Sequence, residues 1–200
     1  MKMSFITLIL IIVGSLNLVL GFLSISQDWK SWKNRFFSIL CFCATAWTFT
    51  NFMTGILPTS FWLKSTYASG AITISAGVMW IFVFINKFFD IKKFIIITTV
   101  ALFFAVASYW DGFIAKSYSV IYPGGAFVGE PNFGLILYAI FFSISGIIIF
   151  YELIFGYRKS KDFEERIQIR YVFYGVISTF SVSSLTSFFF RFFLCISLVG

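Results

Sequence analysis

The sequence predicts an all-α membrane protein, a polytopic bundle of six transmembrane helices whose N-terminus lies outside the cell. Three observations lead to this prediction. The 200-residue chain is 60% hydrophobic and only 12% charged, which is too apolar for a water-soluble domain. Its apolar residues gather in six blocks, each reaching the ~17 to 25 residues that cross about 30 Å of hydrocarbon as a helix. Lys and Arg residues concentrate in alternate gaps between these blocks.

The six blocks form a single membrane domain, residues 1–200. Their approximate residue ranges are 4–25, 36–57, 65–84, 94–110, 133–155 and 171–190. The first block follows Lys2, just as the apolar core of a signal peptide follows a basic residue. It is too long for one and lacks a small-residue cleavage site, so the prediction is a retained helix. Trp29, Trp62 and Trp110 stand near block boundaries, where amphipathic rings prefer headgroup depth.

The charge pattern gives the bundle a direction. The gaps after blocks one, three and five carry three, three and five basic residues, whereas the gaps after blocks two and four hold only Lys64 and Lys116. Short cytoplasmic loops retain Lys and Arg, so the basic gaps are predicted to face the cytoplasm. Lys2 opposes this orientation weakly. Six crossings from an outside start place Gly200 outside as well, and we expect a multi-pass protein of the cell membrane in contact with the lipid bilayer.

Residues 111–132 form the one long connection, an external loop by the charge argument. The alternating segment Ser117–Tyr122, a Pro-Gly-Gly turn and the segment Ala126–Gly129 predict a small β-hairpin. Two roles are open for this loop. It is either a lid that contacts a ligand or a plain surface connection.

The chain contains no histidine. Rhomboid-like, site-2 and CAAX-type membrane proteases, and most membrane acyltransferases, use histidine as a base or metal ligand, so their usual chemistry is excluded. Zinc-ligand spacing and a phosphate loop ending in GK[ST] are also absent from the sequence. We therefore expect no enzyme activity, no catalytic residue, no metal and no cofactor. The net charge of +7 lies in short loops beside the membrane, so nucleic acid is not an expected partner.

Few polar residues fall at membrane depth. Asn51 and Glu152 are the possible intramembrane polar sites, and Asn17 is a third. We expect Asn17 and Asn51 to form hydrogen bonds between helices. Glu152 lies near the basic gap after block five, where it either snorkels to the surface or meets a basic residue.

Small and aromatic residues indicate helix contacts. Ser69, Thr73 and Gly77 recur every four residues in block three and predict close approach of another helix. That helix belongs either to the same bundle or to a second copy in a homodimer. Trp47 and Trp80 lie inside blocks, where they either pack between helices, the favoured interpretation, or face lipid.

A set of residues keeps a distinctive order relative to the helices. It comprises Asn17, Gly21, Asn34, Arg35, Phe36, Phe37 and Trp47 in the first half, and Arg166, Ile167, Gln168, Ile169, Arg170, Tyr171 and Gly175 in the second. Across nearly the whole chain this order resembles the N-terminal seven-helix membrane region of bacterial and archaeal sensor histidine kinases. In physical terms, Asn34 is expected to cap the second helix, and Arg35 and Arg170 to anchor helix starts. Gly21 and Gly175 are expected to allow close helix contact.

The resemblance implies a sensory input module whose seventh helix leads to a cytoplasmic histidine kinase. Because the chain covers about six of the helices, we expect either a fragment with its kinase in cis or a reduced relative that signals through a partner protein. The expected ligand is small, apolar or membrane-derived, in an aromatic pocket between the outer helix halves beneath residues 111–132. A small transporter or channel subunit is the alternative, which would need a polar path through the membrane.

Overall fold

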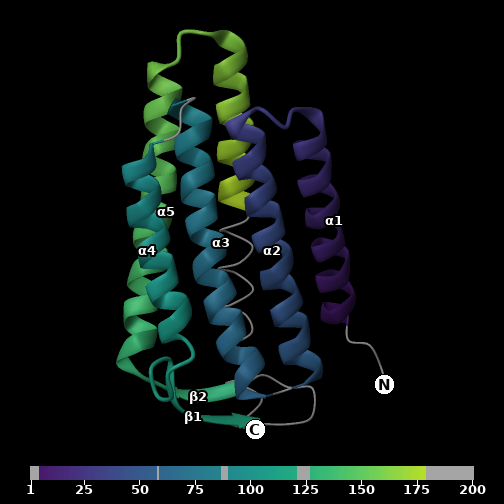
Figure 1. The fold of residues 1–200 in the computed structure, drawn as a ribbon, viewed down its shortest axis with the longest axis vertical. Helices are drawn as coiled ribbons and strands as arrows, with labels where there is room; N and C mark the ends of the chain where they lie inside the picture. The colour runs from purple at the N-terminus through teal and green to yellow at the C-terminus, as the bar shows by residue number, and fades with distance from the viewer. Residues whose placement is uncertain (1–4, 58, 87–89, 121–126, 179–200) are drawn as a thin grey trace, which may run out of the picture. The chain divides into compact units, whose positions relative to one another are not determined.

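The computed structural model describes residues 5–57, 59–86, 90–120 and 127–178. The chain forms two compact units, Met1–Ile149 and Phe150–Gly200. Helices account for most of the described residues (Figure 1). They are α1 (Phe5–Gln27), α2 (Trp32–Ile56), α3 (Ser60–Asn86), α4 (Ile91–Ala107) and α5 (Phe133–Lys159), and residues 163–178 are also helical.

Most of each apolar block lies in a helix as far as it is described, whereas Leu57 and residues 108–110 follow the ends of α2 and α4. Residues 179–190 of the sixth block, and the predicted outside position of Gly200, lie outside the described residues. Several helices extend beyond their apolar blocks, since backbone hydrogen bonding continues into residues whose polar side chains reach the headgroups.

Four helices have the length and composition of membrane-spanning helices. They cover Leu8–Gln27, Trp32–Ile56, Ser60–Asn86 and Phe133–Lys159. These four indicate a membrane protein. Helix α4 has 17 residues, a length of about 25 Å at 1.5 Å per residue. We propose below that α4 and the sixth block also cross the membrane, and that the N-terminus lies outside.

A small β-hairpin accompanies the helices of this predominantly helical fold. Strand β1 (Ala115–Val120) pairs with β2 (Phe127–Pro131) in an antiparallel ladder that aligns Val120 with Phe127. The hairpin predicted from the alternating segments is thus confirmed, whereas the turn at residues 121–126 lies outside the described residues. The two strands satisfy each other's backbone hydrogen bonds, which a helix would satisfy within itself.

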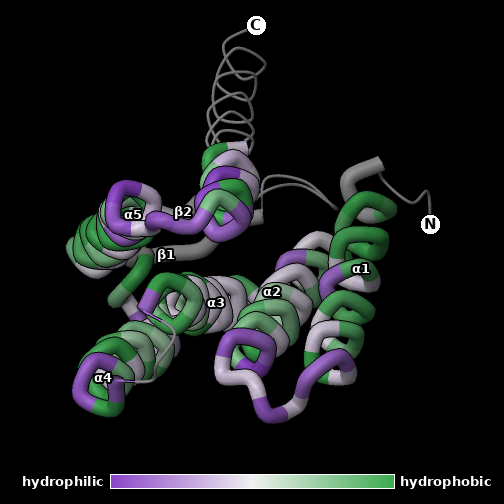
Figure 2. Tube along the Cα trace, turned by 90° about the horizontal axis from the view of Figure 1, so that it is seen from above, coloured by the Kyte–Doolittle hydropathy of each residue, from purple (hydrophilic) through white to green (hydrophobic). Residues whose placement is uncertain are grey.

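Within the unit Met1–Ile149, α1, α2, α3 and α4 lie next to one another in that order (Figure 2). Helix α3 carries the largest share of the described core, in which Ala71, Ala76 and Ile81 are almost completely buried. Its small residues let neighbouring helices approach closely. Most of α1 is exposed and apolar, as expected for a helix that packs on one neighbour and faces lipid elsewhere.

Candidate functional site

A buried cation marks the hairpin end of the unit Met1–Ile149, where α2 ends, α3 begins and α4 ends. The side chain of Lys64, near the start of α3, is only 10% exposed. Its Nζ lies 2.5 Å from Oδ1 of Asp111 and also donates a hydrogen bond to the carbonyl oxygen of Tyr109 at 3.3 Å. The side chain of Asp111 is 98% exposed. The ion pair therefore joins the start of α3 to the segment that follows α4.

Lys64 depends on the ion pair more than Asp111 does. The hydrogen bond from Lys64 and its positive charge lower the pKa of Asp111 below the ordinary value of 3.8, which keeps the carboxylate charged at neutral pH. Water also surrounds Asp111, whereas the buried ammonium depends on the protein for its partners. Loss of Asp111 would leave a buried charge unpaired, whereas loss of Lys64 would leave a carboxylate in water.

Further contacts tie the hairpin end together. Ser65 Oγ lies 2.8 Å from Tyr109 Oη, which joins α3 to the end of α4 a second time. The Asn132 side chain, just before α5, donates to the carbonyl oxygen of Gly112, and its backbone N–H donates to Ile114 at 3.2 Å. Gly112 has φ of 78°, a conformation that favours glycine. The start of α3, the end of α4 and the start of α5 thus share one hydrogen-bonded junction.

Two pairs of hydroxyl groups connect α2 with α3 further from the hairpin end than this junction. Thr54 Oγ1 lies 3.1 Å from Thr66 Oγ1, and Thr50 Oγ1 lies 2.9 Å from Ser69 Oγ. Each of these four hydroxyls also lies within hydrogen-bond distance of a backbone carbonyl three or four residues earlier in its own helix. In an apolar environment such pairs satisfy groups that would otherwise be costly to bury.

Next to Ser69 in α3, a glycine brings three helices together. A Cβ atom on Gly70 of α3 would lie 2.6 Å from Tyr138 Oη of α5 and 3.3 Å from Trp47 Nε1 of α2. Tyr138 Oη donates to the carbonyl oxygen of Tyr67 at 3.0 Å, and the two tyrosine rings meet edge to face at 5.3 Å. The notch at Gly70 is therefore filled by the two aromatic side chains that approach it.

These contacts lie within two turns of α3, from Lys64 through Ser69 to Gly70. We call them, with their partners on α2, α4 and α5, the α3 network. The network links an exposed carboxylate at the surface to helix packing inside the bundle. Its polar groups bond in pairs between neighbouring segments.

The sequence prediction missed the centre of this network. It treated Lys64 as an isolated loop cation. A signal was available, because counting helices places Lys64 and Asp111, with opposite charges, at the same end of the bundle. Gly70 carried no comparable signal, since its neighbours come from distant parts of the chain.

Among the family-like positions, Gly21 has the expected role. A Cβ atom there would lie 2.8 Å from Cε1 of Phe42, so the absence of a side chain permits the contact between α1 and α2. Ser38 Oγ of α2 donates to the Gly21 carbonyl oxygen at 2.7 Å. The close contact predicted at Gly21 is confirmed.

The prediction that Asn34 caps the second helix is wrong. The helix begins at Trp32, the N-cap position belongs to Ser31, and Asn34 lies inside the first turn. The apolar block suggested a later start, but Arg35 N–H already donates to the Ser31 carbonyl oxygen. The Arg35 side chain donates to the Trp29 carbonyl oxygen at 2.6 Å and lies over the Trp29 and Trp32 rings, an anchoring contact at this loop.

The aromatic residues inside the helices take part in helix packing. Trp47 faces the notch at Gly70, and Trp80 of α3 meets the Phe37 ring of α2 at 5.1 Å. In the predicted stripe of small residues, Ser69 bonds to Thr50 of α2. These contacts confirm packing within the bundle, and the homodimer remains a prediction.

In the unit Phe150–Gly200, the second group of family-like residues lies around an arginine. Arg170 donates to Tyr157 Oη at 2.9 Å, while Gln168 and Tyr171 are exposed. A Cβ atom added to Gly175 would have open space within 4 Å, and the close contact predicted there stays a prediction. Arg170 holds the end of α5 to the helix at residues 163–178 through its tyrosine partner.

The polar residues at membrane depth have local roles. The Asn51 side chain donates to the Trp47 carbonyl oxygen of its own helix at 2.8 Å, so the predicted bond between helices is wrong for this residue. Asn17 and Glu152 are half-buried, and neither side chain hydrogen-bonds to any part of the chain that the structure describes. The Asn51 amide thus donates to a carbonyl oxygen one turn earlier in its own helix.

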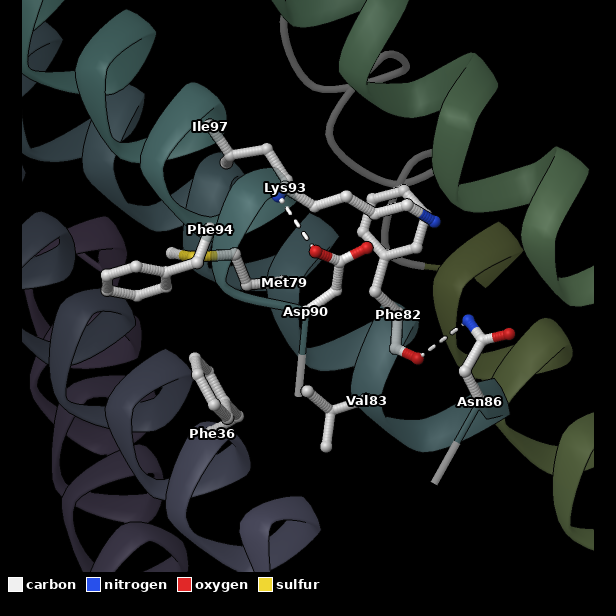
Figure 3. Close-up of a pocket in the computed structure, with 9 residues that line it drawn as sticks. All are labelled: Phe36, Met79, Phe82, Val83, Asn86, Asp90, Lys93, Phe94 and Ile97. Atoms are coloured by element: carbon white, nitrogen blue, oxygen red, sulfur yellow. Dashed lines mark hydrogen bonds between the residues drawn. The ribbon is translucent and has the colours of Figure 1, made fainter. Parts of the chain in front are cut away.

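Two hollows lie in the unit Met1–Ile149. A groove of about 230 Å³ runs between α1 and α2, lined by Leu10, Ile11, Gly14, Ser15, Leu18, Thr45, Thr48, Phe49 and Phe52. The second lies at the opposite end from the hairpin (Figure 3). Neither is lined by residues 111–132, so the predicted pocket beneath that loop remains a prediction.

The described residues hold no group of three or more Cys, Asp and Glu side chains placed to bind a metal ion. Comparison with known proteins gives no identification: no family model matches the chain, and no curated protein or solved structure is similar to it.

Proposed function

We propose that the chain is a sensory input module of a signal-transducing histidine kinase, embedded in the cell membrane and without catalytic machinery of its own. The kinase would follow in cis or act as a partner protein. The observation that carries this proposal is the α3 network, which connects exposed Asp111 to the contact between α3 and α5 at Gly70. The proposed output, a histidine kinase, rests on the resemblance of the sequence to sensor kinases.

The proposed topology has six crossings and an outside N-terminus. Basic residues of the α1–α2 and α3–α4 connections then lie in the cytoplasm, in keeping with the retention of Lys and Arg on that side. The hairpin end, with Lys64 and Asp111, faces outside. Reporter fusions in the two kinds of loop test this topology, and a cytoplasmic reporter signal from the hairpin would contradict it.

Signalling requires two helix packings of similar free energy. In the packing described, Lys64 holds the end of α4 through Asp111, and Tyr138 occupies the notch at Gly70. An event that separates Lys64 from Asp111 would release the start of α3. The network would then pass the displacement to Tyr138, which leaves or re-enters the notch.

The groove between α1 and α2 is the place we propose for a small apolar or membrane-derived ligand. Its lining is mostly aliphatic and aromatic, and the hydroxyls of Thr45 and Thr48 bond to carbonyls of their own helix. It lies between α1 and α2. A ligand could reach it directly from the bilayer, as apolar molecules partition there.

Electron paramagnetic resonance tests the proposed coupling. Spin labels at exposed Ile72 of α3 and Ile140 of α5 report the distance between the helices in liposomes. We expect Lys64→Gln to shift or broaden this distance distribution, whereas Lys92→Gln at the opposite end leaves it unchanged. Identical distributions for all three proteins would refute the relay.

The kinase connection has its own test. Reading the coding sequence after codon 200 shows whether a further hydrophobic segment and a transmitter domain with its phosphoacceptor histidine follow in frame. A module of this kind exchanged onto a reporter kinase should change autophosphorylation when Lys64 is replaced. Unchanged phosphorylation, with the distance shift still present, would leave the relay intact and remove the kinase from the proposal.

A further inference from the structure

The hollow shown in Figure 3 lies at the basic end of the unit Met1–Ile149, where α2 begins, α3 ends and α4 begins. It is an open hollow with a cavity volume of about 20 Å³, and it is lined by Phe36, Met79, Phe82, Val83, Asn86, Asp90, Lys93, Phe94 and Ile97. The Phe36 and Phe94 rings meet at 6.2 Å and close one side. We call it the basic-end pocket.

Among the described residues that line the pocket, Asp90 supplies a carboxylate and Lys93 an ammonium. Oδ1 of half-buried Asp90 accepts hydrogen bonds from the backbone N–H groups of Lys92 and Lys93, at 3.0 and 3.4 Å, and caps α4. No hydrogen bond to its other oxygen, Oδ2, is found among the described residues. In Figure 3 the carboxylate lies near the centre of the pocket.

The Lys93 ammonium does not neutralise this carboxylate. Its Nζ lies 4.4 Å from the centroid of the Phe82 ring. Within the part of the chain that the structure describes, the ion pair is that of Lys64 with Asp111, at the other end of the bundle. Oδ2 of Asp90 and the Lys93 ammonium, which lies over the Phe82 ring, therefore border the same apolar hollow.

We propose that the basic-end pocket binds a phospholipid whose headgroup carries both a phosphate and a primary ammonium, as a phosphoethanolamine does. Lys93 would bind the phosphate, and Asp90 Oδ2 would accept a hydrogen bond from the ammonium. The first acyl carbons would lie against Phe36, Phe94 and Ile97. This inference requires a bilayer around the bundle and is independent of the sensory role.

The two charges distinguish this lipid from its common relatives. A phosphoglycerol headgroup carries no cation, so its phosphate would bind Lys93 while Asp90 repels it. A phosphocholine headgroup carries a quaternary ammonium that has no N–H to donate to Asp90. We therefore expect phosphatidylethanolamine to bind about fivefold more tightly than phosphatidylglycerol or phosphatidylcholine with the same acyl chains.

Native mass spectrometry of the full chain, titrated with these three lipids in detergent, measures the preference. Asp90→Asn retains the helix cap, because asparagine caps as well as aspartate, but removes the charge. It should abolish the preference for phosphatidylethanolamine over phosphatidylglycerol. Lys93→Gln should weaken binding of all three lipids by about fivefold, and Lys93→Arg should restore it.

Matched controls lie nearby. Asp28→Asn changes a carboxylate that accepts from the Lys30 N–H in the α1–α2 connection, and Lys92→Gln removes a neighbouring charge that does not line the pocket. Both should retain the wild-type preference. Ile97→Phe fills the pocket without changing either charge and should weaken the binding of all three lipids. Equal binding of the three lipids to the wild type, or equal effects of Asp90→Asn and Asp28→Asn, would overturn the proposal.

Discussion

The notch at Gly70 gives the sharpest prediction. Replacing Gly70 by alanine would place a methyl group 2.6 Å from Tyr138 Oη, whereas ordinary contacts begin at 3.4 Å. Tyr138 must therefore retreat by about 0.8 Å, the difference between these two distances. Such a retreat breaks the hydrogen bond to the Tyr67 carbonyl oxygen and opens the edge-to-face contact of the two rings.

The expected cost follows from these two contacts. A hydrogen bond between membrane helices contributes about 0.6 kcal/mol on average and about 1.7 kcal/mol at most. The aromatic pair contributes about 0.5 to 1.5 kcal/mol. Gly70→Ala should therefore lower the free energy of unfolding by about 1 to 3 kcal/mol. Tyr138→Phe loses only the hydrogen bond, about 0.6 kcal/mol.

A double-mutant cycle isolates the clash. With Tyr138→Phe present, the new methyl group no longer meets an oxygen, so Gly70→Ala should cost less than half of its wild-type value. Unfolding in mixed micelles, followed by circular dichroism, gives the four free energies. Gly55→Ala is the control, because a Cβ there meets nothing within 4 Å. An undiminished cost of Gly70→Ala in the protein that already carries Tyr138→Phe would refute this account of the notch.

Three further predictions concern stability in detergent, measured as melting temperature. Asp111→Asn should lower it more than Lys64→Met, because only the first leaves a buried charge unpaired; the reverse order would contradict the assigned burial. The pKa of Asp111 is lowered, so the stability that its charge provides is present above the ordinary value of 3.8 and is lost as pH falls through the lowered value. The difference between wild type and Asp111→Asn should therefore be constant at neutral pH and vanish in strong acid; a difference that grows in acid would be inconsistent with this sign. Gly21→Ala should destabilise by about 1 to 3 kcal/mol through overpacking against Phe42, whereas Gly14→Ala, whose Cβ would lie an ordinary 3.5 Å from Thr48, should have little effect.

The helices and the hairpin were predictable because each depends on local properties of the sequence. Length and apolar content determine whether a segment suits the bilayer, and alternation with a Pro-Gly-Gly turn indicated the hairpin. The start of α2 was misplaced because backbone hydrogen bonds do not require apolar side chains. Asn34 consequently lies within the helix that it was expected to cap.

The contacts between helices were less accessible. The Ser69 stripe indicated a close approach, but only the three-dimensional arrangement identifies Thr50 as its partner. Gly70 and Tyr138 are far apart in sequence, and nothing in either neighbourhood indicates that one accommodates the other. Asn51 shows the opposite limitation, since its amide bonds locally although its depth suggested a neighbouring helix.

The short helix α4 has a mechanical consequence. At 17 residues it measures about 25 Å, whereas the 27 residues of its neighbour α3 measure about 40 Å. In the proposed topology, a bilayer about 30 Å thick must thin beside α4, or α3 must tilt. Hydrophobic mismatch then acts directly on the two helices that Lys64 and Asp111 connect. Bilayer thickness becomes a force on the bundle, independent of any ligand.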